Sequence, residues 1–391
     1  MIFHANMCQV TVEILNKQNS FKMEDISYNK TIGIWMSEKK SQKLNWKELI
    51  SVCSSHGYKL IKLDLELPLE EQGHIDVLLH KLTDIIAAAD QGDLKASKII
   101  SHVEQYLSNH PNVTVIDPLD KVRILLNRNQ YYTILQEEPT FQKQGIFTPN
   151  FAEFTTNNIE RNIEIMLQRG VTFPVICKPT IAHGSKSAHE MIVIFNEKGL
   201  NVCKPPCVVQ SFVNHNAVLH KVFLVGDRYH ICERPSLKNF YASDDLEPIF
   251  YSTGEVCKAD SQSTLSILDP HDQPDITMMV NEDKVKHIVR VLRKKINLLL
   301  AGFDVVIDNA SGNHAVIDIN VYPSYDNFPS FFKHLMDSID ETVSKKLNNV
   351  YSNGDCSDFY AEDLLSCHRM NGLINVAMDP IRYGVTGMNM N

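Results

Sequence analysis

The sequence contains no hydrophobic run long enough to cross a membrane. Its most apolar stretch, residues 296–303, lies between Lys295 and Asp304, and it is far shorter than the roughly 20 residues that a spanning helix needs. The first residues also lack a basic segment followed by an apolar one, which a secretory signal would have. We therefore expect a protein without membrane partners that resides in the cytoplasm.

An excess of positive charge is also missing. The chain has 38 Lys and Arg against 47 Asp and Glu, which gives a net charge of −9 with neutral His. Proteins that bind nucleic acid usually carry net positive charge, so we expect no nucleic-acid partner. Because salt screens exposed charges over roughly 10 Å, a local basic pocket is still compatible with this acidic balance.

Paired cysteines and the common nucleotide motifs are absent as well. The 9 cysteines are scattered without a CxxC pair, and no second Cys or His pair follows Cys203 and Cys207 at a zinc-site spacing. This pattern predicts reduced structural thiols in a cytosolic protein. Neither GxxxxGK[ST] nor GxGxxG occurs, which excludes the P-loop and Rossmann fingerprints.

What is present predicts an ordinary globular chain of two or three domains, from its 391 residues, 43% apolar and 22% charged. Residues 30–120 predict an open α/β sheet, because short apolar strands alternate with amphipathic helices. The expected strands are 31–35, 59–65, 75–79 and 112–116, and the expected helices are 46–53 and about 93–107. Residues 1–29 lack periodicity and predict a flexible extension.

The pattern changes to hairpins and helices after about residue 120. The predicted strands are 173–177, 190–195, 207–212, 221–225, 228–232, 302–307 and 315–320, and the predicted helices are 159–167, 285–296 and 332–343. Gly226-Asp227 is a turn signal between two strands. We expect a central lobe at 121–214, a C-terminal lobe at 215–349 and a disordered polar tail at 350–391.

Oxygen-bearing side chains in the last hairpin predict a metal site. Asp318 and Asn320 are two residues apart on one strand and face the same way. A short turn can bring Asp304 of the partner strand beside them. Aspartate is uncommon in strands and costly to bury unpaired, and three oxygen donors suit Mg²⁺. Ordinary polar strand positions are the alternative.

Basic residues form the second candidate constellation. Lys178 ends an apolar strand, where a lysine can neutralise nucleotide phosphates or can simply be solvated. The remaining basic residues are scattered along the chain and matter only if folding gathers them: Lys39, Lys40, Lys81, Arg128, His189, Lys221, Arg234 and Lys238.

Several segments, in this order, carry a specific family resemblance. They are Trp35-Met36-Ser37-Glu38-Lys39-Lys40, His80-Lys81-Leu82-Thr83-Asp84, Val208-Val209-Gln210, Asn214-His215-Asn216-Ala217-Val218, Arg234-Pro235-Ser236-Leu237-Lys238-Asn239-Phe240 and Ala315-Val316-Ile317-Asp318-Ile319-Asn320. Over about residues 31–345 the sequence closely resembles the inositol-tetrakisphosphate 1-kinases, also called inositol 1,3,4-trisphosphate 5/6-kinases.

The resemblance implies an ATP-grasp fold, with an N-terminal open α/β (Rossmann-like) domain and two α+β lobes that enclose ATP. It implies a kinase that uses ATP and two Mg²⁺ ions. The acceptor would be inositol 1,3,4-trisphosphate at the 5 or 6 hydroxyl, or inositol 3,4,5,6-tetrakisphosphate at the 1 hydroxyl. The front domain would help to bind the inositol phosphate, and a monomer is the family expectation.

The resemblance also implies roles for individual residues. The expected ATP contacts are Arg128, Lys178, Gln210, Lys221 and Ser236, with Gln210 opening the strand whose backbone meets adenine. Asp304 and Asp318 would hold one Mg²⁺, and Asp318 with Asn320 a second. The expected inositol-phosphate contacts are Lys40, Lys81, His189, Lys221 and Asn320. Lys178, Lys221 and Asp318 are the expected catalytic residues.

Three points stay open at this stage. His189 could accept the hydroxyl proton or only bind phosphate, and in a phosphate-rich site its pKa should tend upward. Thr253, Cys257 and Ser324 depart from the family pattern, which puts loop geometry and substrate preference in question. Two rival functions are an ATP-grasp ligase that joins a carboxylate to an amine, and a non-enzymatic inositol-phosphate binder.

Overall fold

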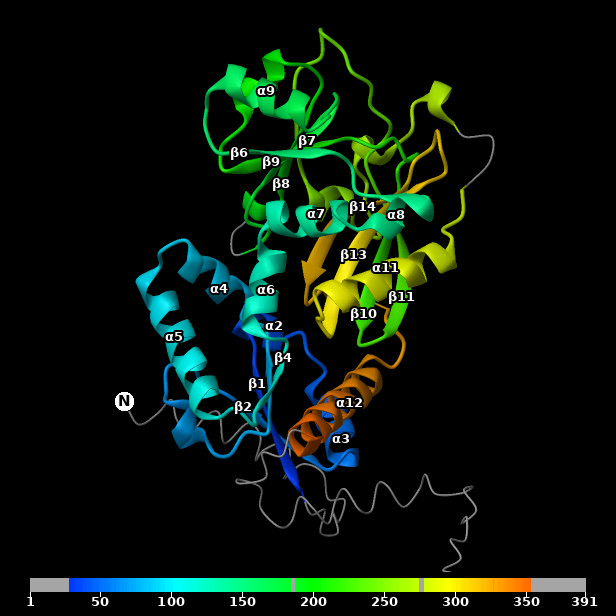
Figure 1. Cartoon of the computed structure of the whole chain (residues 1–391). Helices are drawn as coiled ribbons and strands as arrows, with labels where there is room; N and C mark the ends of the chain where they lie inside the picture. The colour runs from blue at the N-terminus through cyan, green and yellow to red at the C-terminus, as the bar shows by residue number, and fades with distance from the viewer. Residues whose placement is uncertain (1–27, 184–186, 274–277, 326, 353–391) are drawn as a thin grey trace, which may run out of the picture. The chain divides into compact units, whose positions relative to one another are not determined.

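The computed structural model describes residues 28–183, 187–273, 278–325 and 327–352. Chain contacts divide the protein into residues 1–340 and 341–391, and all three β-sheets lie in the first unit (Figure 1). The predicted extension and tail fall outside the described residues, apart from 28–29 and from 350–352, which end helix α12 (Phe331–Ser352). Among the helices described, none has the length and apolar character needed to cross a membrane.

The first sheet is the predicted parallel α/β sheet. Its strand order is β2-β1-β3-β4, and every pair is parallel. The strands are β1 (Lys30–Trp35), β2 (Tyr58–Lys62), β3 (Val77–His80) and β4 (Thr114–Ile116), and its helices are α3 (Trp46–Ser55), α4 (Thr83–Asp90) and α5 (Leu94–Asn109). Asn45 and Asp93 cap α3 and α5 through their side chains. Helix α4 was not predicted, because eight residues give too little periodicity.

The second sheet is wholly antiparallel, in the order β12-β8-β7-β9-β6. Its strands are β6 (Phe151–Phe154), β7 (Val175–Pro179), β8 (Glu190–Ile194), β9 (Cys207–Ser211) and β12 (Ile249–Ser252). Met166 of α9 (Ile159–Gln168) belongs to the apolar cluster on one face of this sheet, with Val175 and Val209. The opposite face carries a second apolar cluster, in which Ile176 and Met191 also line a cavity.

The third sheet has the order β11-β10-β13-β14-β5. Its strands are β5 (Ile146–Phe147), β10 (Val218–Val225), β11 (Arg228–Pro235), β13 (Leu300–Ile307) and β14 (His314–Val321). All its pairs are antiparallel except β14 with β5. Helix α11 (Glu282–Lys295) lies along this sheet (Figure 1), begins at the Asn281 cap and buries Val285 and Ile288.

Two edge strands cross between the second and third sheets. Strand β5 precedes β6 in the chain but pairs with β14 of the third sheet. Strand β12 follows β11 in the chain but pairs with β8 of the second sheet. Each sheet thus takes an edge strand from the chain segment that builds the other.

Asp117 joins the first sheet to the third. Its carboxylate accepts the backbone N–H groups of Leu299 at 2.6 Å and Leu300 at 2.9 Å, just where β13 begins. Its backbone N–H bonds the hydroxyl of Tyr322, and its carbonyl oxygen lies 2.7 Å from His80 Nε2. Burial raises the pKa of Asp117 to about 6, against the lowering effect of the two backbone donors.

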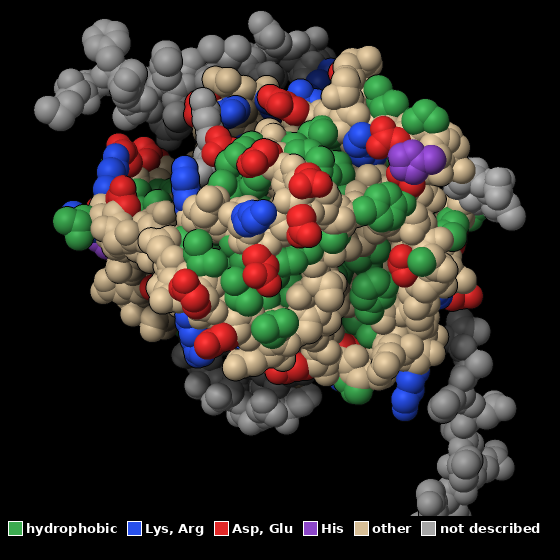
Figure 2. All heavy atoms as spheres, turned by 90° about the horizontal axis from the view of Figure 1, so that it is seen from above, with side chains coloured by type: hydrophobic (Ala, Val, Ile, Leu, Met, Phe, Trp, Pro, Cys, Tyr) green, Lys and Arg blue, Asp and Glu red, His purple; other side chains and the backbone are tan. Residues whose placement is uncertain are grey.

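The remaining helices are short connections: α2 (Glu38–Ser41), α6 (Leu119–Leu126), α7 (Arg128–Gln136), α8 (Pro139–Lys143) and α10 (Thr253–Val256). On the face drawn in Figure 2, acidic and basic side chains are interspersed among hydrophobic ones.

Candidate active site

Three charged side chains stand in one row across the third sheet. The register pairs Lys221 of β10 with Asp304 of β13, and Asp304 in turn with Asp318 of β14. Side chains at paired positions share a face, so the three project together, and Asn320 follows Asp318 two residues along the same strand. Lys221 Nζ lies 3.4 Å from Asp304 Oδ1.

A β-bulge beside this row supplies a backbone acceptor. The register shifts between Asp304 and Val305, so that Ile317 of β14 has no opposite residue. The carbonyl oxygen of Ile317 accepts a hydrogen bond from Lys178 Nζ at 2.8 Å and another from Tyr132 Oη at 2.7 Å. The bulge thereby ties the second sheet and α7 to the carboxylate row.

Lys178 and Gln210 come from neighbouring strands of the second sheet. Lys178 opposes Val208, and Gln210 opposes Ile176, so Lys178 and Gln210 are diagonal neighbours on one face. Lys178 Nζ donates to Gln210 Oε1 and to Tyr132 Oη, both at 2.8 Å. Gln210 does not open its strand as predicted, because β9 begins at Cys207; its buried Nε2 has no hydrogen-bond partner among the described residues.

Helix α7 adds a guanidinium and two phenols. Arg128, Tyr131 and Tyr132 occupy positions i, i+3 and i+4 and so lie on one helix face. Arg128 is buried, donates to Pro179 O at 2.6 Å, and holds Nε 3.8 Å from Asp318 Oδ1. The Tyr131 hydroxyl donates a hydrogen bond to Asp318 Oδ1. The tyrosines were not predicted, although their spacing from Arg128 is a signal that could have found them.

The two carboxylates have opposite electrostatic environments. Burial raises the pKa of Asp304, and neighbouring Asp318 raises it further against the pull of Lys221. Burial also acts to raise the pKa of Asp318, but Arg128 and Lys178 outweigh it, so the pKa of Asp318 is lowered. Asp304 Oδ1 is buried, and apart from the ion pair with Lys221 at 3.4 Å it has no hydrogen-bond donor among the described residues. An additional cation beside Asp304 would therefore be stabilised.

The basic groups are tuned by the same burial. Desolvation lowers the pKa of Lys178 to about 8, although Asp318 acts against it. Asp304 raises the pKa of Lys221. Burial and then Arg128 lower the pKa of His189, at the end of the short helical turn Ser187–His189. The upward tendency expected for His189 concerned a phosphate-loaded site, and the protein's own groups act in the other direction.

Ser236 is oriented by a buried histidine. His215 Nε2 lies 2.7 Å from Ser236 Oγ, and His215 Nδ1 lies 2.6 Å from Val213 O. Burial lowers the pKa of His215 to about 4, so the ring is neutral near pH 7. Nδ1–H then donates a hydrogen bond to Val213 O, and Nε2 accepts a hydrogen bond from the Ser236 hydroxyl. The Ser236 oxygen keeps its lone pairs for a ligand.

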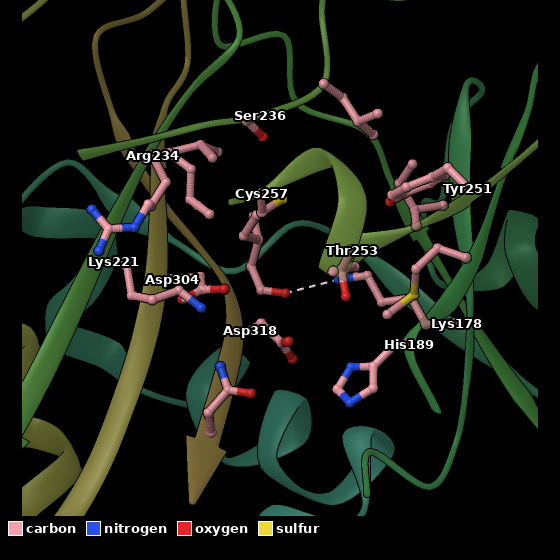
Figure 3. Close-up of a pocket in the computed structure, with 18 of the residues that line it drawn as sticks. Lys178, His189, Lys221, Arg234, Ser236, Tyr251, Thr253, Cys257, Asp304 and Asp318 are labelled. Atoms are coloured by element: carbon pink, nitrogen blue, oxygen red, sulfur yellow. Dashed lines mark hydrogen bonds and ion pairs between the residues drawn. The ribbon is translucent and has the colours of Figure 1, made fainter. Parts of the chain in front are cut away.

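These groups line one cavity of about 630 Å³ between the second and third sheets. Figure 3 shows Lys178, Lys221, Asp304 and Asp318 around the same space, with His189 at its border. A volume of this size suits a nucleotide-sized ligand. Every departure noted in the sequence, Thr253, Cys257 and Ser324, also lies in its wall.

A second cavity of about 410 Å³ lies between the first and third sheets. Its polar wall contains Lys40, Lys43 and Lys81. Lys81 Nζ donates to Tyr322 O, and burial, followed by nearby Lys40, lowers the pKa of Lys81 to about 8. Ser324 lines both cavities, so the two adjoin at the loop after β14.

Comparison with known proteins identifies the family to which this chain belongs. Residues 141–341 match the model of the inositol 1,3,4-trisphosphate 5/6-kinase ATP-grasp domain, and residues 31–122 match the pre-ATP-grasp domain of the same kinase. The chain belongs to the inositol 1,3,4-trisphosphate 5/6-kinase family.

Relatives with known names are similar in sequence to this chain over most of its length. An inositol-tetrakisphosphate 1-kinase of Xenopus laevis is 40% identical over 81% of this chain and 80% of its own. One of Danio rerio is 38% identical over 84% of this chain and 82% of its own. The solved structure of the D-cycloserine synthetase DcsG covers 80% of this chain and 99% of its own at 11% identity, with a TM-score of 0.51. That likeness concerns the fold alone, and the ATP-grasp fold predicted from the sequence is confirmed by the family model.

Membership of this ATP-grasp kinase family implies that the protein uses ATP. The structure gathers Arg128, Lys178, His189, Gln210, Lys221, Ser236, Asp304, Asp318 and Asn320 around the first cavity, and it places Lys40 and Lys81 around the second. Arg234 also reaches the first cavity. Lys39 lines neither cavity, and Lys238 is engaged by Asp269 at 2.8 Å.

Proposed function

We propose that this protein transfers the terminal phosphoryl group of ATP to a free hydroxyl of an inositol polyphosphate, inositol 1,3,4-trisphosphate at the 5 or 6 position or the 3,4,5,6-tetrakisphosphate at position 1. The observation that carries the proposal is the meeting of two cavities at Ser324, one lined by buried carboxylates and cations, the other by lysines. A donor and an anionic acceptor can thus face each other.

The donor cavity fits a divalent cation. Asp304, Asp318 and Asn320 offer oxygen donors on adjacent strands, which is the ligand chemistry that Mg²⁺ prefers. Asp304 Oδ1, which is buried and apart from its ion pair with Lys221 has no hydrogen-bond donor among the described residues, fits as a ligand. Asp304 with Asp318 would hold one ion, and Asp318 with Asn320 a second. Bound there, Mg²⁺ supplies neutralisation of the phosphate charge that develops during transfer.

The chain's own cations would bind and orient the nucleotide. Lys178 is held by three acceptors, at Tyr132, Gln210 and Ile317, so its ammonium is positioned before a ligand arrives. Lys221 opposes Asp304 from the next strand, and Ser236 presents an oriented oxygen. Phosphoryl transfer depends mainly on positioning and charge neutralisation, which such fixed groups provide.

The acceptor would occupy the space around Ser324, with its phosphates toward Lys40 and Lys81. His189 and Asn320 border the same region from the donor cavity. The pKa of His189 is lowered in the protein alone, which favours a neutral ring whose nitrogen can accept a hydrogen bond from the acceptor hydroxyl and serve as general base. Bound phosphates act in the opposite direction, and a protonated ring would instead bind phosphate.

The direct test is incubation with Mg²⁺, ATP and inositol 1,3,4-trisphosphate, followed by positional analysis of the product. We expect ADP formation that depends on the inositol phosphate, with a new phosphate at the 5 or 6 position. ADP release with amino-acid substrates but not with inositol phosphates would instead indicate ligase chemistry. Tight inositol-phosphate binding without ATP consumption would indicate a non-enzymatic binder.

A matched pair of variants tests the acceptor cavity. Lys40 lines it, whereas its neighbour Lys39 does not. We expect Lys40→Ala to raise the KM for the inositol phosphate about tenfold, the loss of roughly 1.4 kcal/mol of charge-assisted binding, and to leave the KM for ATP almost unchanged. Lys39→Ala should change neither. Equal effects of Lys40→Ala on both KM values would remove Lys40 from the acceptor site.

A monomer in the cytoplasm remains our expectation for the whole protein. None of the described cysteines forms a disulfide, which is usual for a reducing compartment. Light scattering of the purified protein tests the monomer, and imaging of a tagged full chain tests the compartment.

A further inference from the structure

Three buried thiols meet behind the donor cavity. The described part of the chain holds six cysteines, none of which forms a disulfide. Three of them, Cys177, Cys203 and Cys207, place their Sγ atoms within 4.8 Å of one another. Half of the described cysteines thus converge on one point, although Cys177 lies far from the other two in the sequence.

The register of the second sheet explains the convergence. Cys177 of β7 opposes Val209, and Cys207 of β9 opposes Pro179, so the two cysteines are diagonal neighbours on one face. This face is opposite to the one that carries Lys178 and Gln210, because side chains alternate along a strand. Cys203 follows the short helical turn Lys198–Val202 and approaches from the connection into β9.

The surroundings of the thiols are apolar. Cys177, Cys203 and Cys207 are 4%, 9% and 2% exposed, and they belong to the cluster that includes Phe154 and Met166. Among the described residues no histidine or carboxylate completes the group. Lys204 and Pro206, between the last two cysteines, are exposed, so the thiols lie just beneath the surface at this turn.

The geometry points to a binding site for a single soft, thiophilic d¹⁰ cation, Cu⁺ or Zn²⁺, held by the Sγ atoms of Cys177, Cys203 and Cys207. Sulfur ligands select such cations over Mg²⁺ or Ca²⁺. Three sulfurs that bind one ion of about 2.3 Å bond length lie roughly 4 Å apart, so only a small contraction of the observed cluster is required. Each sulfur that binds releases its thiol proton to solvent, and no electron is transferred.

The three-donor set distinguishes the two cations. Zn²⁺ in structural sites is four-coordinate, so here it needs a fourth ligand from outside the described residues. Cu⁺ is stable with three sulfur ligands alone. We therefore expect both ions to bind, and Cu⁺ to bind more tightly. The site is independent of the proposed kinase function, since it lies on the opposite face of the strands.

Metal titration of the whole protein tests the site. Reduced, metal-free protein is titrated anaerobically with Cu⁺, and separately with Zn²⁺, against a weak competing chelator. We expect one ion per chain, an ultraviolet thiolate-to-metal charge-transfer band, and at least a hundredfold loss of affinity in Cys177→Ser, Cys203→Ser and Cys207→Ser. Cys232→Ser, which alters a buried strand cysteine outside the cluster, should keep full affinity.

X-ray absorption on the wild-type protein with one equivalent of Cu⁺ provides a test that needs no variant. A first shell of three sulfurs supports the site even where a serine variant fails to fold. A shell dominated by nitrogen or oxygen overturns it. The absence of tight binding by either ion, or a disulfide between any two of the three cysteines in protein purified under reducing conditions, overturns it as well.

Discussion

Asp304 and Asp318 show how two identical side chains acquire different properties. They oppose each other on paired strands, yet Asp318 faces Arg128 and Lys178, whereas Asp304 has Lys221 and is otherwise buried without a hydrogen bond from the described residues. The protein's own groups therefore favour the ionised form of Asp318 more strongly than that of Asp304. Asp318 is also the one shared by both proposed metal positions.

Replacement of Asp318 should therefore abolish turnover without unfolding the protein. In Asp318→Asn the shape and the acceptor for Tyr131 remain, but the charge is lost, and we expect kcat to fall at least a hundredfold, about 3 kcal/mol. Asp308→Asn is the matched control, because Asp308 bonds Ala310 in the turn of the same hairpin. A near-normal kcat for Asp318→Asn at saturating Mg²⁺ would remove Asp318 from the metal set.

Lys178 should make nucleotide binding dependent on pH. Its pKa is about 8 because it is buried, and bound phosphate favours its charged form. Above pH 8 the Lys178 side chain is mostly a neutral amine and must regain a proton when ATP binds. The Kd for ATP should therefore rise toward tenfold per pH unit. Calorimetry in two buffers of different ionisation enthalpy measures the proton uptake at pH 9. Lys178→Met should bind without it, and equal uptake in that variant would assign the proton to another group.

At the residue scale, the sequence identified groups but not their partners. The meeting of Asp304 with Asp318 could be predicted because aspartates are unusual within an apolar strand, and the metal that they would hold stays a prediction. Tyr131 and Tyr132 were missed because phenols in a helix more often belong to a core. The cysteine cluster was missed because Cys177 reaches Cys203 and Cys207 only through strand pairing, which the chain spacing does not reveal.

At the element scale, the long periodic segments were predicted, and so were the short apolar strands β3 and β4, whereas other short elements were not. Helices α3, α5, α9 and α11 and the two hairpins of the third sheet lie where their patterns indicated, because several turns or alternations repeat one signal. Strands β5, β6 and β12 have two to four residues, too few for a period. The bulge at Ile317 also has no local signal, although its carbonyl oxygen orients Lys178.

The Asp117 link between the first and third sheets should contribute strongly to stability. Asp117→Ala leaves the buried N–H groups of Leu299 and Leu300 without their acceptor, which costs about 1–3 kcal/mol each. We expect the free energy of unfolding to fall by about 2–5 kcal/mol in denaturant titrations. Asp120→Ala, at an exposed position in the first turn of α6, should cost less than about 1 kcal/mol.

The pH dependence of this loss has a definite sign. The pKa of Asp117 is about 6 in the folded protein and near 4 when unfolded. Between these values the folded state binds more protons, so this group stabilises the fold below pH 4 and loses that contribution as the pH rises through 6. The difference between wild type and Asp117→Ala should therefore be larger at pH 4 than at pH 7, by up to about 3 kcal/mol. A difference independent of pH would contradict the raised pKa.

At the scale of the whole molecule, the chain has a net negative charge, yet several of its lysine and arginine side chains line two adjoining cavities. If the nucleotide binds in the first cavity as proposed, it would contact the second and third sheets but not the first. A nonhydrolysable ATP analogue with Mg²⁺, at a hundredfold excess over its Kd, should raise the free energy of unfolding by about 2.7 kcal/mol. Hydrogen exchange should slow in β7, β9, β10, β13 and β14 and stay unchanged in β2. Equal protection of all three sheets would place the nucleotide elsewhere.

The reciprocal placement of β5 and β12 limits how this protein can be dissected. A gene divided near residue 214 would yield one fragment that has β5 without its partner β14, and another that has β12 without β8. Each fragment would expose unpaired backbone N–H and C=O groups along a sheet edge, and such edges promote self-association. We then expect the two fragments to be soluble only when they are co-expressed. The second and third sheets are therefore expected to fold together, as one unit.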